Sequence, residues 1–183
     1  FTIENNLYVT TADGQETQVT NEPEGVLCGQ SVHRNEFGIN GGIFWSPKGN
    51  LLAFYRMDQS MVTDYPQVNT STRIATLEPD KYPMAGMTSH IVKLHVYNFE
   101  TGKELMIKTG EPEDQYLTAI TWNPDNEKIY IGVLNRGQNH LKFNEYSAIN
   151  GEYLQTIFED TDEQYVEPVG PAHFLPNNNE EFV

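Results

Sequence analysis

Two hairpin motifs alternate along the chain, and this alternation constrains the fold more than any other feature of the sequence. In the first motif an aromatic residue is followed two positions later by a proline, then by turn-forming residues and a second apolar run. It occurs over residues 42–56, 119–133 and 172–183. The aromatic and proline positions are Trp45 and Pro47, Trp122 and Pro124, and Phe174 and Pro176. Proline pre-sets the φ angle of the first central position of a turn, so each copy predicts a strand, a tight turn and a second strand.

The second motif places a glycine at the tip of a predicted hairpin. The glycines are Gly14, Gly102 and Gly151, within residues 7–19, 94–107 and 142–158. Glycine supplies the positive φ that short hairpin loops need, and Asp-Gly and Asn-Gly pairs are strong hairpin signals. Each copy therefore predicts another pair of antiparallel strands.

The spacing of the motifs indicates how the strands are grouped. Gly102 and Gly151 lie 49 residues apart, and Trp122 and Phe174 lie 52 apart. The interval from Trp45 to Trp122 is 77 residues, because of an insertion at 57–90. Four strands in a unit of this length are typical of a β-propeller blade. We therefore predict an all-β chain, a partial β-propeller of about three to four antiparallel four-stranded blades.

The motifs also suggest blade boundaries. The predicted segments are the end strands of one blade at 1–22, a blade with the 57–90 insertion at 40–110, a blade at 116–160 and the start of the next blade at 165–183. Since a closed propeller typically has four to eight blades, we expect the chain to be a fragment of a longer protein. The alternative is a small stand-alone sandwich of antiparallel sheets, which would leave sheet edges exposed as pairing sites.

Charge and composition exclude several kinds of partner. The formal net charge is −15, from 11 basic and 26 acidic residues, which disfavours nucleic acid and anionic membranes. No run of apolar residues is long enough for membrane insertion. The single Cys28 excludes an internal disulfide, and we predict no metal site and no cofactor. The acidic run 159–164 is not a calcium loop, because Tyr165 and Pro171 stand where that motif needs glycine and glutamate.

Beyond these general features, three stretches of the chain resemble the propeller domain of the dipeptidyl peptidase IV family. They are residues 44–66, with a Trp-Ser-Pro turn, residues 81–103, and residues 116–146. In that family a long insertion ends in a Tyr-Pro-x-Ala-Gly motif, and a strand of the form Val-x-x-x-Val follows this motif. The matching residues here are Tyr82, Pro83, Ala85, Gly86, Val92 and Val96. The order of these motifs is more specific than Trp-Ser-Pro alone, which many propellers share.

The resemblance implies a function for a longer parent chain. Members of the family are serine exopeptidases that remove N-terminal dipeptides, and their Ser-Asp-His triad lies on a C-terminal α/β-hydrolase domain. This chain has no Gly-x-Ser-x-Gly elbow, so we expect no catalytic residues and no peptidase activity from it alone. The expected role is to gate access and to help bind the free N-terminus of peptide substrates. The resemblance also implies a periplasmic or secreted location.

Two alternatives to this role remain open at the level of sequence. One is a TolB-like or other propeller that binds protein partners and has no peptidase domain. The other is an inactive member of the peptidase family.

One residue is a candidate for the substrate-binding role. The family binds the substrate ammonium with two adjacent glutamates before the Trp-Ser-Pro strand, and the corresponding segment here is SVHRNEFGI, 31–39. Glu36 is its only acid, nine residues before Trp45, and Arg34 and Asn35 stand where a second acid is expected. A single carboxylate could accept tripeptides or longer chains. The alternative is an ordinary surface acid paired with Arg34.

A second departure lies near the third repeat. The resemblance implies an arginine there from a later blade. The chain instead has Glu167 and Pro168 in the segment 165–174.

The 57–90 insertion is the remaining candidate site. Long loops in compact domains are usually functional or disordered, and the apolar residues scattered through this one argue against full disorder. In the resembling family the excursion packs against a second subunit. We therefore expect an interface arm that includes Met61, Tyr65 and Tyr82, and a possible homodimer.

Overall fold

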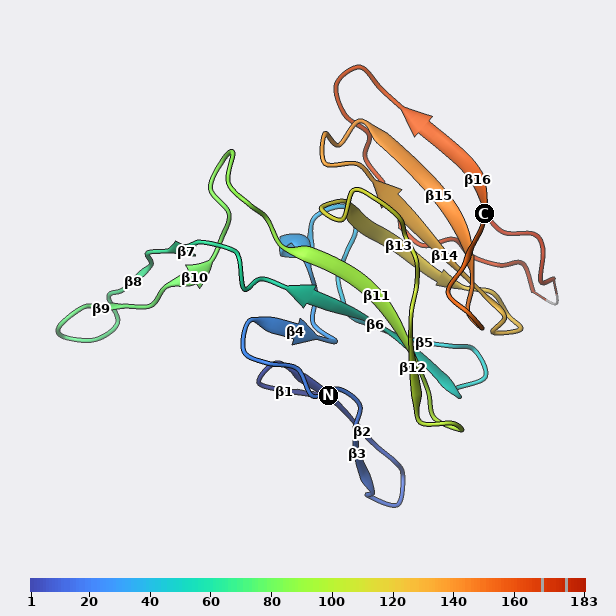
Figure 1. The fold of residues 1–183 in the computed structure, drawn as a ribbon, viewed down its shortest axis with the longest axis horizontal. Coiled ribbons are helices and arrows are strands. Elements are labelled where there is room, and N and C mark those ends of the chain that lie inside the picture. The colour runs from blue at the N-terminus through green and yellow to red at the C-terminus, as the bar shows by residue number, and fades with distance from the viewer. Residues whose placement is uncertain (169, 177) are drawn as a thin grey trace.

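The computed structural model describes residues 1–168, 170–176 and 178–183, and in them the regular structure is almost entirely β (Figure 1). The strands of the main sheets are β1 (Thr2–Ile3), β2 (Asn6–Thr10), β3 (Glu16–Gln18), β4 (Val26–Cys28), β5 (Ile43–Trp45), β6 (Leu51–Asp58), β11 (Ile91–Asn98), β12 (Lys103–Met106), β13 (Tyr116–Trp122), β14 (Lys128–Leu134), β15 (His140–Ser147) and β16 (Tyr153–Thr161). Four short strands, β7 (Asp64–Tyr65), β8 (Val68–Asn69), β9 (Thr76–Leu77) and β10 (Asp80–Lys81), lie in the insertion, and a 3-10 turn, η1, covers His33–Asn35.

Three antiparallel sheets follow one another along the chain. The first has the order β1-β2-β3, the second β12-β11-β6-β4 with β5 also paired to β6, and the third β13-β14-β15-β16. Figure 1 shows them as an open stack from the blue N-terminal end to the orange C-terminal end. The predicted all-β chain of antiparallel sheets, a partial propeller, is confirmed, while the blade boundaries stay a prediction.

Both hairpin motifs fold largely as predicted. The glycine tips Gly14, Gly102 and Gly151 have φ angles of 85°, 65° and 75° and connect β2 to β3, β11 to β12 and β15 to β16. The first two proline motifs form the β5–β6 and β13–β14 turns. The third forms only a single bridge between Phe174 and Phe182 in the part that the structure describes.

The central strand β6 is buried on both faces because it stands between two other sheets. Ala53 and Tyr55 point into one hydrophobic cluster, which also contains residues of β13 and β14. Leu52 and Phe54 point into another, which contains Leu7 of the first sheet. Since alternate side chains of a strand face opposite sides, the continuous apolar sequence of β6 suits this sandwiched position.

Hydrogen bonds fix the second and third sheets against each other. The Tyr55 hydroxyl donates to the Leu117 carbonyl at 2.7 Å, and the Trp122 indole donates to the Phe44 carbonyl at 3.0 Å. Burial raises the pKa of Tyr55, so its hydroxyl stays a donor. These buried side chains satisfy backbone groups between sheets, which sets the sheets in one relative position.

The first strand of the second sheet is interrupted, and a loop fills the interruption. Both β4 and β5 pair with the same strand: Cys28 lies opposite Arg56, and Ile43 lies opposite Phe54. Between these pairs, the backbone of Tyr55 bonds to both ends of the interruption. Its carbonyl accepts from the Gly29 amide at 2.9 Å, and its amide donates to the Gly42 carbonyl at 3.0 Å.

Residues 30–41 therefore leave and re-enter the sheet at a single point, and we call them the 30–41 loop. Strand β4 was not predicted from the sequence, because its three residues are too few to show a periodic pattern.

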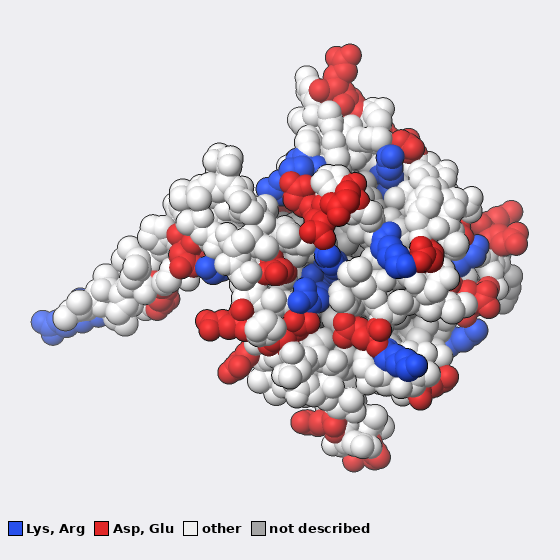
Figure 2. All heavy atoms as spheres, viewed as in Figure 1, with Lys and Arg blue, Asp and Glu red and all other residues white. Residues whose placement is uncertain are grey.

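The insertion forms an arm that projects from the end of β6 (Figure 1). Two short ladders hold it, β7 with β10 and β8 with β9. The surface of the arm visible in Figure 2 is largely uncharged, whereas acidic groups are spread over the body of the molecule. The arm is thus an ordered extension, and its role as an interface stays a prediction.

Candidate functional site

The 30–41 loop has a strained backbone. His33, Arg34, Asn35 and Phe37 have φ angles of 51°, 57°, 62° and 58°. Non-glycine residues are uncommon in this left-handed region, and four of them within five positions is a costly arrangement. Such strain persists only where the surrounding structure enforces it, and it is concentrated at functional sites. The 30–41 loop is therefore a candidate functional site.

Contacts with the third sheet enforce this conformation. The Thr118 hydroxyl donates to the Phe37 carbonyl at 2.7 Å. The Tyr116 ring packs against the Phe37 ring, with centroids 4.6 Å apart, and against the edge of the His33 ring at 4.8 Å. Thr118 and Tyr116 both belong to β13, so a strand of the third sheet holds a loop of the second.

Glu36 lies on this loop, and its carboxylate is open to solvent. It is exposed, and its carboxylate makes no ion pair or hydrogen bond with any residue that the structure describes. Arg34, two positions earlier, pairs with Asp80 of β10 at 2.7 Å instead, and its guanidinium lies 4.8 Å from the centre of the Tyr82 ring. The sequence left open an ion pair between Glu36 and Arg34. In the structure Arg34 pairs with Asp80 and not with Glu36.

Two grooves meet at Glu36. We call the first the arginine groove; its volume is about 440 Å³, and its lining residues are His33, Arg34, Glu36, Phe37, Tyr82, Pro83, Ser89, His90, Tyr116, Arg136 and Gln138. We call the second the glutamate groove; its volume is about 520 Å³, and its lining residues are Glu36, Phe37, Gly38, Gln138, Tyr165, Val166, Glu167 and Pro168. Glu36, Phe37 and Gln138 line both, so a ligand at Glu36 can extend in either direction.

The glutamate groove brings a second acid to Glu36. Glu167, from the segment after β16, lines the same groove, and the Val166 amide fixes that segment by donating to the Gln138 carbonyl at 2.7 Å. From the sequence, Glu167 was noted only as standing where an arginine is expected, because 131 residues separate it from Glu36. No local sequence pattern predicts that two positions so far apart in the chain lie close together in the fold.

The floor of the arginine groove is uncharged at neutral pH. Burial, assisted by the nearby His90 and Arg136, lowers the pKa of His33 to about 3. Burial also lowers the pKa of His90, with smaller effects from Arg34 and Arg136. Both imidazoles are therefore neutral, and the positive charges in this groove belong to its two arginines.

The expected arm residues lie where the arm leaves the body and returns to it. Met61, Tyr65 and Tyr82 are exposed to 38%, 44% and 45%. Tyr65 and Tyr82 pack edge to face with centroids 5.9 Å apart. Tyr82 also lines the arginine groove, so the structure joins one arm residue to the Glu36 site.

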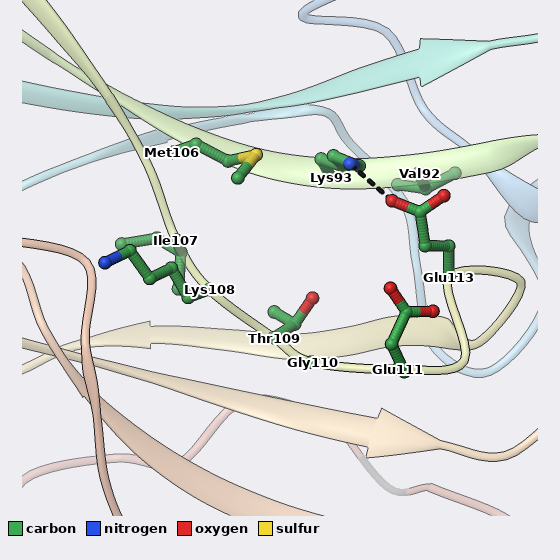
Figure 3. A pocket seen from close by; sticks show the side chains of 9 residues that line it. All are labelled: Val92, Lys93, Met106, Ile107, Lys108, Thr109, Gly110, Glu111 and Glu113. Atoms are coloured by element: carbon green, nitrogen blue, oxygen red, sulfur yellow. Dashed lines mark hydrogen bonds and ion pairs between the residues drawn. The ribbon is translucent and has the colours of Figure 1, made fainter.

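A third hollow lies elsewhere and is a weaker candidate. It has a volume of about 160 Å³ between β11 and the 106–113 segment, and Figure 3 shows Glu111 and Glu113 at its rim. Lys93 pairs with Glu113 at 2.6 Å, the dashed line in Figure 3, so that carboxylate already has a cationic partner. No residue lining this hollow lines either groove at Glu36.

In the described part of the chain, no three His, Cys, Asp or Glu side chains are grouped so that they could hold a metal ion. No helix there combines the length and the apolar character needed to cross a bilayer.

Known proteins are similar to this chain in sequence and in fold. The family model described as "Dipeptidyl peptidase IV (DPP IV) N-terminal region" matches residues 1–183. A crystal structure of a candidate dipeptidyl aminopeptidase IV from Bacteroides ovatus is 54% identical with a TM-score of 0.90, covering 99% of this chain and 25% of that one. Porphyromonas gingivalis dipeptidyl peptidase 4 is 27% identical with a TM-score of 0.81, covering 91% of this chain and 24% of that one.

Among curated sequences, a probable dipeptidyl-aminopeptidase B of Phaeosphaeria nodorum is 29% identical over 162 residues, which are 78% of this chain and 18% of that protein. The chain thus spans a quarter or less of the length of these relatives.

Proposed function

Because this chain belongs to the family of dipeptidyl peptidase IV N-terminal regions, we propose that it is the non-catalytic propeller part of a serine exopeptidase and binds the free N-terminus of peptide substrates through Glu36. The main support for the proposal is the Glu36 carboxylate, which has no partner among the described residues and is held on a strained and well-anchored loop where two grooves meet. The family match favours this reading over a TolB-like propeller without a peptidase domain.

The chemistry of the site suits an ammonium group. A carboxylate that accepts a hydrogen bond from an ammonium forms a charge-assisted bond, roughly twice as strong as a neutral one. Among the described residues Glu36 forms no ion pair, and Arg34, two positions earlier, is paired with Asp80. Glu167 lines the same groove and supplies a second carboxylate in place of the adjacent glutamate that the sequence lacks. The loop is anchored before the ligand arrives, so little ordering is needed on binding.

The catalytic step belongs to another domain in this proposal. The relatives are several times longer than this chain, and the chain has no nucleophile elbow. The propeller would gate access to an α/β-hydrolase domain and fix the distance between the substrate amine and the scissile bond. The location, periplasmic or secreted, stays a prediction.

Glu36→Gln in the full-length peptidase tests this role. We expect kcat/KM for a free-amine glycyl-prolyl chromogenic substrate to fall about 10- to 100-fold, the equivalent of one charge-assisted hydrogen bond. The matched control is Glu16→Gln on β3, an exposed glutamate that lines neither groove, and it should leave kcat/KM unchanged. Equal kcat/KM values for Glu36→Gln and the wild type would refute the role of Glu36.

The arm is proposed to pack against a second copy of the chain. Several of its apolar side chains are exposed to solvent: Val68, Ile74 and Leu77 are exposed to 62%, 83% and 64%. Contiguous exposed apolar surface of this kind marks interaction sites, and burial of aromatic and aliphatic side chains drives association.

Sedimentation of the full-length protein tests the arm. The wild type should sediment as a dimer, and Leu77→Asp should yield monomers because it places a charge in the interface. Ile149→Asp, at an apolar residue that is exposed to 75% on the hairpin before β16, serves as the control and should remain dimeric. A monomeric wild type, or dimers that persist in Leu77→Asp, would remove the arm from the interface.

A further inference from the structure

We propose that Arg136 forms a second anchor beside Glu36, one that binds a carboxylate on the side chain of the first substrate residue, so that peptides beginning with aspartate or glutamate are preferred. This inference rests on the proposed function, because it takes the substrate ammonium to be bound at Glu36. It adds a specificity for acidic N-terminal residues that an ammonium anchor alone does not provide.

Arg136 is presented on a rigid hairpin tip. It lies between β14 and β15, where the Asn135 side-chain oxygen accepts from the Asn139 and His140 amides, both at 3.0 Å. The Gln138 amide donates to the Asn135 carbonyl at 2.9 Å and closes the turn. The Arg136 guanidinium then lies 4.9 Å from the centre of the Tyr116 ring, the same ring that supports Phe37 and His33. One aromatic platform therefore holds both the Glu36 loop and the arginine.

Arg136 is the available cation of the arginine groove. It makes no ion pair with any residue that the structure describes, whereas Arg34 is paired with Asp80 at 2.7 Å. The histidines of the floor are neutral at pH 7, as their lowered pKa values require. A ligand carboxylate entering this groove thus meets one uncommitted guanidinium, whose fork of N–H donors fits a carboxylate in a bidentate way.

The charges of the site match a zwitterion. Glu36 and Arg136 line the same groove, one negative and one positive, with the aromatic rings of Phe37 and Tyr116 also lining it. In a peptide that begins with aspartate or glutamate, the ammonium and the side-chain carboxylate branch from the same Cα. A ligand of this class can pair both charges at once, whereas a neutral first residue leaves Arg136 unpaired and a lysine is repelled by it.

The test compares two isosteric substrates in the full-length peptidase, the aspartyl-prolyl and asparaginyl-prolyl chromogenic dipeptides. We expect the wild type to favour the aspartyl substrate about tenfold in kcat/KM, as one partly exposed charge-assisted bond allows. Arg136→Gln should bring this ratio to about one, because the aspartyl substrate loses its ion pair. Arg136→Lys should restore part of the preference, and Arg73→Gln on the arm is the matched control that should keep all of it.

The outcomes separate the two claims. If Glu36→Gln lowers kcat/KM for both substrates and the wild-type ratio is near one, the acidic specificity is overturned and the proposed function stands. If the wild-type ratio is high but Arg136→Gln keeps it, another group binds the carboxylate and the role of Arg136 is overturned. If Glu36→Gln has no effect on either substrate, both claims fail together. A preference that declines between 0.05 and 0.5 M salt, roughly as screening predicts, supports the ion pair.

Discussion

Replacing Gly42 by alanine should destabilise the chain by about 3 kcal/mol or more and lower its midpoint of thermal unfolding by roughly 6–12 °C. Gly42 closes the 30–41 loop, and a Cβ atom there would lie 2.0 Å from the Gln30 carbonyl oxygen and 2.3 Å from its carbon. These are backbone atoms, so no rotamer change relieves the contact. The substitution must therefore move β5 or open the loop.

Gly41→Ala is the matched control for this prediction. A Cβ at Gly41 has no neighbour within 4 Å, and its φ lies outside the left-handed region. We expect its midpoint to stay within a degree or two of the wild type, or to rise slightly, because alanine restricts the unfolded chain. Thermal unfolding followed by near-UV circular dichroism measures both variants. Equal midpoints for the two alanine variants would contradict the closed geometry of the loop.

Tyr116→Ala should have the second large effect, a loss of about 3–5 kcal/mol in the free energy of unfolding. Tyr116 is 6% exposed, and its ring contacts Phe37, His33 and the Arg136 guanidinium. Removing it leaves a cavity and takes away the support of the strained loop. Urea unfolding measures the loss, and hydrogen exchange at the amides of 33–37 should accelerate more than in the β14–β15 ladder.

Tyr116→Phe keeps the ring and removes the hydroxyl, so it distinguishes the contributions of the two groups to stability. The Tyr116 hydroxyl makes no hydrogen bond with any described residue, so the phenylalanine variant should unfold within about 1 kcal/mol of the wild type. A large loss in Tyr116→Phe, or unchanged exchange at 33–37 in Tyr116→Ala, would show that the ring is not what holds the loop.

Much of the fold could be predicted from local signals. Glycines such as Gly102 and Gly151 sit at hairpin tips because only a few residues tolerate the positive φ required there, and this preference is visible in any window of sequence. The Trp45 and Trp122 motifs predicted strand pairs because the proline two positions later presets the φ angle of a tight turn. Strand β4 was missed, since its place in the sheet depends on pairing with β6 across 28 residues.

The site was predictable only in part. Glu36 came from the resemblance, but its lack of a partner depends on the pairing of Arg34 with Asp80, 46 residues away. The approach of Glu167 and Arg136 to Glu36 arises from the stacking of two sheets and a later segment. Such contacts follow from tertiary packing, which no periodicity of the sequence encodes.

A crystal structure of the full-length protein with a slowly cleaved peptide whose N-terminus is free would show directly which groups bind the substrate amine. We predict that the peptide ammonium donates a hydrogen bond to the Glu36 carboxylate, with the rest of the substrate running toward the hydrolase domain. An ammonium bound by other groups, with Glu36 facing solvent, would contradict it.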